Sequence, residues 1–122
     1  MVGTGRSARE LGQAAEALAC RHLELQGLRI VERNVRFRCG EIDAVARAGQ
    51  TWVFVEIRSR ARRGDAAASI DWRKRGKIRR AAQLYLVRHF GDHWPACRFD
   101  VVLVEGGAVQ WLPSAFALDE ER

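Results

Sequence analysis

The stretch GEIDAVARAGQTWVFVEIRSR, residues 40–60, decides the fold. It holds two runs, 41–47 and 51–58, in which β-branched and other apolar residues alternate with polar ones, and each run predicts a β-strand. Gly49 and Gln50 stand between the runs, and a glycine in the first position suits a two-residue type II′ turn. We therefore expect an antiparallel hairpin in which residues equally distant from the turn lie opposite one another.

This register predicts different chemistry on the two faces of the hairpin. The apolar face pairs Ile42 with Ile57, Ala44 with Val55, and Ala46 with Val53. On the other face, Asp43 lies opposite Glu56, and Glu41 lies opposite Arg58, at the open end. Opposed Cβ atoms are roughly 4.5–5.5 Å apart, so two carboxylates placed there repel one another unless a cation lies between them.

Two interpretations of these charges stay open on the hairpin alone. Asp43 and Glu56 are candidate ligands of Mg²⁺ or Mn²⁺, since a hard divalent cation takes carboxylate, water and phosphate oxygens. Side chains alternate along a strand, so Arg58 shares a face with Glu56 and its charge would neutralise a phosphate. The alternative is a surface ladder in which Glu41 pairs with Arg58 and the other two carboxylates are solvated. Opposed like charges cost stability in a sheet, which favours the metal site.

Periodic patterns outside the hairpin predict two helices and three further strands. Apolar residues at three- and four-residue spacing predict a helix over residues 8–26, ended by Gly27, and a second helix over 71–90. The further strands are predicted at 28–37, at 97–105 and, shorter, at 109–113. The order is helix, three strands, helix, two strands, which predicts a single α/β domain over residues 1–122.

Basic side chains gather in one segment. The net charge is +6, and 19 of the 21 basic residues are arginines. Residues 58–80 carry a balance of +8, which leaves −2 for the rest of the chain. Guanidinium groups bind phosphate in a bidentate manner, so the segment predicts a nucleic-acid partner, DNA or RNA; a merely solvated surface is the alternative. The predicted contact residues are Arg60, Arg62, Arg63, Arg73, Lys74, Arg75, Lys77, Arg79 and Arg80.

Several other functions are excluded. Cys20, Cys39 and Cys97 are widely separated and form no C-x-x-C pair, so we expect free thiols in place of disulfides or a zinc site. No stretch is apolar enough to span a bilayer, and the N-terminal residues lack the apolar region of a signal peptide, so we expect a cytoplasmic protein with no membrane partner. The absence of a phosphate-binding glycine loop and of a nucleophile elbow excludes nucleotide hydrolysis and serine chemistry.

The hairpin and the segments before and after it together resemble a known family. The segments are LGQAAEALACRHL, GLRIVERNVR, GEIDAVA, WVFVEIRSR, RKRGKIRRAAQLYL and RFDVVLV. This combination resembles the YraN-type family of uncharacterised bacterial proteins, in the restriction-endonuclease-like, PD-(D/E)xK fold group. The resemblance implies an α-β-β-β-α-β core, with a central mixed sheet flanked by helices. It also implies a metal-dependent nuclease for DNA or RNA, including branched or structured substrates. Relatives of this fold pair to cut two strands, so a homodimer stays open.

The resemblance assigns a role to each charged residue of the hairpin. It makes Asp43 the metal-binding aspartate, Glu56 the acid of the D/E-x-K element and Glu41 the glutamate of GEID. Glu16 corresponds to an acidic position of the first helix that approaches the metal. Arg58 stands where the family has lysine, and arginine stays protonated at any relevant pH. We therefore expect either a nuclease that Arg58→Lys would accelerate, or a non-catalytic binding module whose activity was lost through Arg58. A structural partner in a nucleoprotein complex is a third reading.

Two further pairs of residues have open roles. Lys74 and Lys77 are the only lysines. Lys74 corresponds to a lysine position of the family and would partly replace the lysine absent at position 58; a solvated helix face is the alternative. Arg98 and Asp100 share one face of the strand 97–105, where they form a structural ion pair or buttress the site.

Overall fold

A computed structural model describes residues 8–59 and 72–118 of the chain. The elements are α1 (Ala8–Leu25), β1 (Arg29–Phe37), β2 (Gly40–Ala48), β3 (Thr51–Ser59), α2 (Trp72–Phe90), β4 (Cys97–Glu105) and β5 (Ala108–Phe116). The predicted α/β class and element order are confirmed. The α-β-β-β-α-β order implied by the resemblance is present, with β5 added after it.

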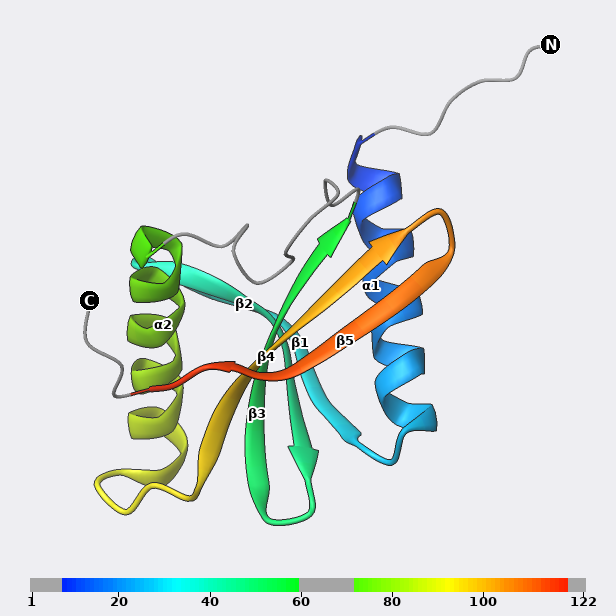
Figure 1. Cartoon of the computed structure of the whole chain (residues 1–122). Coiled ribbons are helices and arrows are strands. Elements are labelled where there is room, and N and C mark those ends of the chain that lie inside the picture. Colours follow the sequence, from blue (N-terminus) through cyan, green and yellow to red (C-terminus); the bar gives the residue numbers. More distant parts are fainter. Residues whose placement is uncertain (1–7, 60–71, 119–122) are drawn as a thin grey trace, which may run out of the picture.

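A mixed sheet forms the middle layer of the molecule. Its strands lie in the order β1-β2-β3-β4-β5, and β3 runs parallel to β4 while all other neighbours are antiparallel. Two parallel strands need a crossover connection, and α2 belongs to the connection between β3 and β4. The helices α1 and α2 lie on opposite sides of the sheet (Figure 1).

Two apolar clusters hold the layers together. The cluster beneath α2 includes Ile78, Tyr85 and Leu86 of the helix and Val45, Phe54 and Phe99 of the sheet. The cluster beneath α1 includes Ala15, Ala19 and Leu23 of the helix and Ala44, Val53, Val55 and Val102 of the sheet. The alanines on α1 and on β2 let that helix approach the sheet closely. The central strand β3 is therefore buried on both faces.

α1 ends at a glycine, as predicted. Gly27 has a φ of 100°, a conformation that costs glycine little. The N–H of Leu28 donates to the carbonyl of Leu23, and the N–H of Gly27 donates to the carbonyl of Glu24, each at 3.0 Å. These two bonds form a Schellman motif. Because Leu28 and Leu23 are buried in the same cluster, the turn that ends α1 also directs the chain into β1.

The hairpin of β2 and β3 has the predicted register near its turn. Ala48 pairs with Thr51, and the ladder continues to the pair of Ala44 and Val55. Gly49 has a φ of 62°, as the first central residue of a type II′ turn requires.

One residue of the predicted apolar face lies on the other side of the sheet. Ile42 is buried beneath α2, whereas Ala44 is buried and Ile57 packs beneath α1. Asn34 of β1 lies between Arg33 and Val35, the partners of Ala44 and Ile42, and it has a φ of 56°. The prediction that Ile42 and Ile57 share a face was wrong, because a left-handed residue within a strand cannot be read from hydrophobic alternation.

β5 is longer than predicted. The sequence predicted a shorter strand over 109–113, paired with the strand before it through Gly106 and Gly107. The strand instead reaches Phe116, and its register with β4 shifts between the pairs that Leu112 and Phe116 form. Ser114, in this interval, has a φ of 55°. The irregularity takes Pro113 out of the ladder, and pairing resumes after it.

Candidate active site at the open end of the hairpin

Asp43 lies where the ladder between β2 and β3 stops. The last backbone pair is Ala44 with Val55. One residue further, Oδ2 of Asp43 accepts a hydrogen bond from the backbone N–H of Ile57 at 2.7 Å. The carboxylate thus takes the place of a backbone acceptor and keeps the two strands in contact beyond their ladder.

Glu56 is the second carboxylate at this point, and only 6% of its side chain is exposed. Burial raises the pKa of Asp43 to about 8, and the charge of Glu56 adds to the effect, while the hydrogen bond from Ile57 acts in the opposite direction. The predicted convergence of Asp43 and Glu56 is therefore present, although they lie just outside the ladder. With a pKa of about 8, the carboxyl group of Asp43 is mostly protonated at neutral pH.

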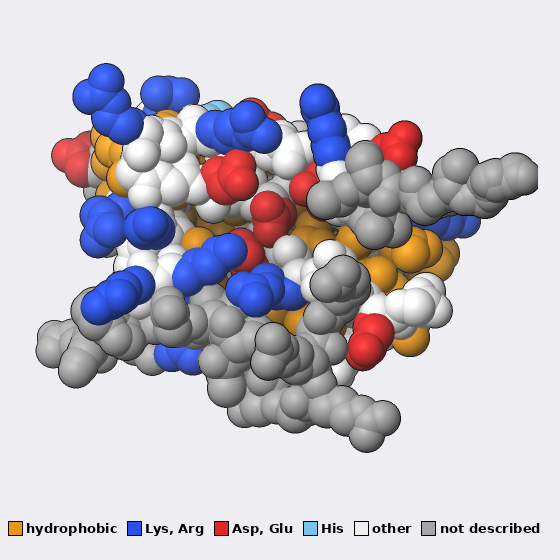
Figure 2. All heavy atoms as spheres, turned by 90° about the horizontal axis from the view of Figure 1, so that it is seen from above, with side chains coloured by type: hydrophobic (Ala, Val, Ile, Leu, Met, Phe, Trp, Pro, Cys, Tyr) orange, Lys and Arg blue, Asp and Glu red, His pale blue; other side chains and the backbone are white. Residues whose placement is uncertain are grey.

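The two carboxylates open into a cavity of about 410 Å³ between α2 and the start of β2. Its lining consists of Gly40, Glu41, Asp43, Glu56, Arg73, Lys74, Lys77 and Ile78. Figure 2 shows acidic side chains across the middle of this face, with basic side chains on both sides of them. A site that combines carboxylates with a basic rim suits a cation together with a phosphate.

Lys74 reaches into this cavity from α2. Its Nζ lies 2.9 Å from Oε2 of Glu56. Of the lysine side chain 47% is exposed, so the ammonium group borders solvent while its partner is buried. The lysine that the sequence suggested as a partial replacement for position 58 therefore contacts the acid of the D/E-x-K element.

Glu41 and Arg58 do not form the predicted cross-strand pair. Glu41 instead pairs with Arg36 of β1, with 3.2 Å between Oε1 and Nε, and both side chains are largely exposed. Arg58 is half-buried next to Leu103 of β4, and it is not among the described residues that line the cavity. The predicted pair of Glu41 and Arg58 assumed that the hairpin register continues to the open end. The ladder ends at Ala44 and Val55, so this pair does not form.

Glu16 stands apart from the two carboxylates of the cavity. It lies on α1 and pairs with Arg33 of β1, with 3.5 Å between Oε1 and Nη2. Its charge is the smallest of the causes that raise the pKa of Asp43. Within residues 8–59 and 72–118, no three histidine, cysteine, aspartate or glutamate side chains are close enough together to hold a metal ion. In the described residues, Glu16 therefore does not complete a cluster of three carboxylates with Asp43 and Glu56.

The residues predicted to contact nucleic acid fall into different environments. Arg60, Arg62 and Arg63 lie outside the described residues. Arg73, Lys77 and Arg80 are exposed. Arg75 and Arg79 are half-buried, with their guanidinium carbons 5.6 and 5.7 Å from the centre of the Phe116 ring. These two arginines pack on β5, so the exposed members of the predicted set within the described residues are Arg73, Lys74, Lys77 and Arg80.

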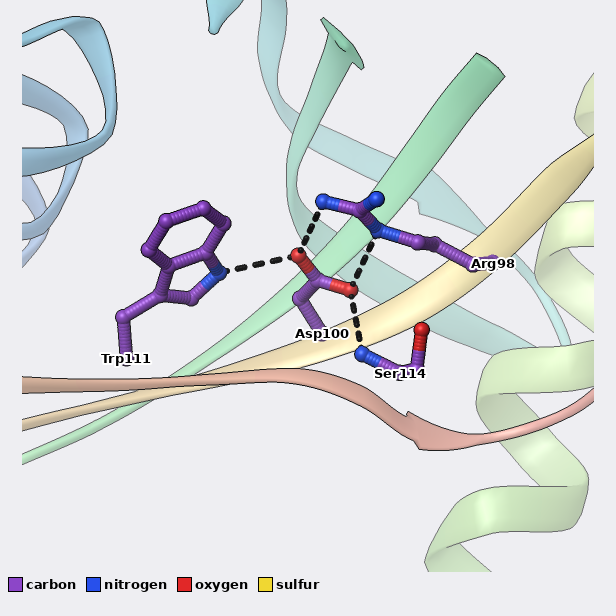
Figure 3. Close-up of polar contacts among 4 residues, drawn as sticks. All are labelled: Arg98, Asp100, Trp111 and Ser114. Atoms are coloured by element: carbon purple, nitrogen blue, oxygen red, sulfur yellow. Dashed lines mark hydrogen bonds and ion pairs between the residues drawn. The ribbon is translucent and has the colours of Figure 1, made fainter. Parts of the chain in front are cut away.

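A second buried carboxylate, Asp100 on β4, has different partners. Arg98 donates to it through Nε and Nη2 at 3.0 and 3.2 Å, Trp111 through Nε1 at 2.9 Å, and Ser114 through its backbone N–H at 2.9 Å (Figure 3). Asp100 is fully buried, and four donors satisfy its two oxygens. The predicted structural ion pair is confirmed. Sequence reasoning missed Trp111 and Ser114, because only the irregularity in β5 brings both to the same carboxylate.

Two further observations concern the cysteines and the helices. Cys20, Cys39 and Cys97 are free thiols, as predicted, and burial raises the pKa of Cys20 and of Cys97. Neither α1 nor α2, in the part described, is apolar enough over a sufficient length to cross a membrane.

Comparison with known proteins shows which family the chain belongs to. The model of the Uncharacterised protein family UPF0102 matches residues 15–104, a range that includes Asp43, Glu56 and Lys74. The chain belongs to the UPF0102 family. The YraN-type resemblance found in the sequence is thereby confirmed.

Three UPF0102 relatives illustrate how far the similarity extends. A protein of Shewanella sp. (strain W3-18-1) is 52% identical over 108 residues, which cover 87% of this chain and 98% of the relative. One of Dechloromonas aromatica is 50% identical over 111 residues, covering 89% and 90%. One of Klebsiella pneumoniae is 46% identical over 116 residues, covering 93% and 91%. The similarity thus covers nearly the whole of this chain and of these relatives.

Proposed function

We propose that this UPF0102 protein is a metal-dependent phosphodiesterase that cuts DNA or RNA. The observation that carries the proposal is the convergence of the half-buried Asp43 and the buried Glu56 in a cavity with a basic rim. Two carboxylates placed side by side at a largely enclosed site resist being ionised together, so the arrangement needs a reason. A site for a divalent cation and a phosphate supplies that reason.

The donor set fits Mg²⁺ or Mn²⁺. Mg²⁺ is commonly held by one or two carboxylates, with waters and substrate phosphates completing its shell, so two protein ligands are enough. The raised pKa of Asp43 implies a bound proton at neutral pH, and a divalent cation would replace that proton. When bound, such an ion lowers the pKa of a water molecule and polarises a phosphoryl oxygen.

The residues of the chain have separate tasks in this proposal. The backbone N–H of Ile57 orients the carboxylate of Asp43. Glu56 supplies a second oxygen ligand from the buried floor of the cavity. Arg73 and Lys77, at the rim, attract the phosphate backbone without reading its sequence.

A non-catalytic nucleic-acid-binding module is the second candidate. Two observations favour it: Glu56 already has an ammonium partner in Lys74, and the described residues contain no cluster of three metal-ligating side chains. In this case the basic surface would bind the polyanion, and the carboxylates would only shape the cavity.

The decisive experiment is a cleavage assay on linear and branched DNA and RNA with Mn²⁺ or Mg²⁺. We expect the wild type to cut at least one substrate, and Asp43→Asn and Glu56→Gln to cut it at least about 10²-fold more slowly. Asp92→Asn, which neutralises a carboxylate that is 98% exposed, is the control for a contaminating nuclease and should cut like the wild type. Binding of the same substrates without any cleavage would favour the binding module.

A further inference from the structure

The cation nearest to the acid of the D/E-x-K element comes from a helix. Lys74 of α2 contacts Glu56, whereas Arg58, on the same strand as Glu56, is not one of the described residues around the cavity. We propose that Lys74 supplies the active-site cation that the resemblance places at position 58. The inference rests on the proposed function and assigns a further catalytic residue to it.

The packing of α2 holds Lys74 in this position. Lys74, Lys77 and Ile78 are spaced by three and four residues, so they share one face of the helix, and all three line the cavity. Ile78 is 3% exposed and anchors this face in the core. Gly40 fixes the opposite wall, because a Cβ on it would lie 2.9 Å from the carbonyl oxygen of Lys77. The start of β2 and α2 are therefore in direct contact beside the contact of Lys74 with Glu56.

The Nζ of Lys74 is suited to contact Glu56 first and a substrate phosphate later. In the chain without metal, the ammonium group neutralises Glu56 at 2.9 Å. Its four-carbon stem is flexible, and with 47% of the side chain exposed the Nζ is able to turn toward a phosphate at the cavity mouth. There it keeps its proton and donates a hydrogen bond to a non-bridging oxygen, which stabilises the negative charge that grows during phosphoryl transfer. A planar guanidinium at position 58 is not needed for this role.

The first test measures metal affinity and does not depend on cleavage. Mn²⁺ is titrated by calorimetry into the wild type, Lys74→Gln and Lys77→Gln. Because Lys74 competes with the metal for Glu56, its removal should tighten Mn²⁺ binding by at least about fivefold, as the loss of one charge-assisted hydrogen bond implies. Lys77→Gln removes an equal charge from the same cavity wall, and its gain in Mn²⁺ affinity should be less than half of the gain in Lys74→Gln. An equal effect of both substitutions, an unchanged affinity in Lys74→Gln, or no Mn²⁺ binding to any of the three proteins would overturn the proposal.

The second test measures single-turnover cleavage. Lys74→Gln should cut about 10²–10³-fold more slowly than the wild type, the usual cost of losing one well-placed donor. Arg88→Gln removes a charge from the same helix beside the Phe37 ring, away from the cavity, and is the control that should retain the wild-type rate. If Lys74→Gln cuts as fast as the wild type while Arg58→Lys cuts at least tenfold faster, the cation belongs to the strand and the proposal is wrong. If no protein cuts any substrate, the nuclease function itself fails, and the metal titration alone decides whether Lys74 is the cation of this site.

Discussion

The carboxylate of Asp43 and the backbone N–H of Ile57 are joined by a hydrogen bond of 2.7 Å across two strands whose ladder has already ended. This bond fixes the half-buried carboxylate of Asp43 next to Glu56, and the charge of Glu56 adds to the effect of burial in raising the pKa of Asp43. The cost of that arrangement depends on pH and on any cation in the cavity, and both dependences can be measured.

Asp43 should make the metal-free protein less stable as the pH rises. Its pKa is about 8 in the folded chain and about 3.9 in an unfolded one. Between those values the folded state holds the extra proton, so the free energy of unfolding falls as the pH rises from about 4 to about 8, and stays low above that. Asp43→Asn retains an oxygen acceptor for the N–H of Ile57 and removes this pH-dependent fall in the free energy of unfolding. At pH 8.5 without metal its Tm should exceed that of the wild type, where 1 kcal/mol corresponds to about 3–6 °C.

The control for this pH effect is Asp92→Asn, since Asp92 is almost fully exposed; its Tm should follow that of the wild type across the pH range. Mn²⁺ should raise the Tm of the wild type at pH 8.5 and leave that of Asp43→Asn unchanged. A Tm of Asp43→Asn below the wild-type value at pH 8.5 would contradict the assignment of a destabilising charge.

The exposed face of α2 should bind nucleic acid without sequence preference. Replacing Arg73, Lys77 and Arg80 by glutamine should weaken binding to every sequence alike, because these side chains are placed to contact phosphates only. The slope of log K against log salt should become shallower by about 0.9 for each duplex phosphate that the variant no longer neutralises. Filter binding at several salt concentrations measures both effects. Arg88→Gln, away from the cavity on the same helix, provides the comparison, and a triple variant with an unchanged slope would disprove the assignment.

Gly40 should be intolerant of a side chain. A Cβ on it would lie 2.9 Å from the carbonyl oxygen and 3.2 Å from the Cβ of Lys77, so α2 would have to shift. Gly40→Ala should lower the free energy of unfolding by about 1–3 kcal/mol, the usual cost of overpacking. Gly12→Ala, inside α1 and with nothing within 4 Å of the new Cβ, should instead stabilise the protein by about 1 kcal/mol. Urea denaturation compares the two, and equal effects would show that the contact with α2 is unimportant.

Asp100 should matter for stability and not for the metal site. Asp100→Asn leaves the guanidinium of Arg98 without its buried charge partner, and breaking such a pair costs about 3–5 kcal/mol. Trp111→Phe removes one donor of the four and should cost about 1 kcal/mol. Denaturant unfolding gives both values. Mn²⁺ affinity, measured where each variant is folded, should match the wild type; a loss of metal binding would mean that Asp100 acts on the cavity.

The sequence by itself was enough to predict the element order and the hairpin register close to its turn. Both depend on local rules: hydrophobic periodicity marks each helix and strand, and Gly49 allows the turn that aligns β2 with β3. The candidacy of Asp43 and Glu56 followed from the same register and from the family resemblance. These features involve residues that are near in the chain or related by simple alternation.

Only the tertiary structure decided which charges meet. The packing of α2 against the start of β2 brings Lys74 to Glu56, while Arg33 of β1 pairs with Glu16. Arg58 was assigned to the site by a register whose ladder ends three pairs before it, at Ala44 and Val55. Side-chain contacts at the end of a ladder depend on how helices pack over the sheet and where backbone pairing gives way. Those are long-range packing relationships that no spacing within a single strand contains.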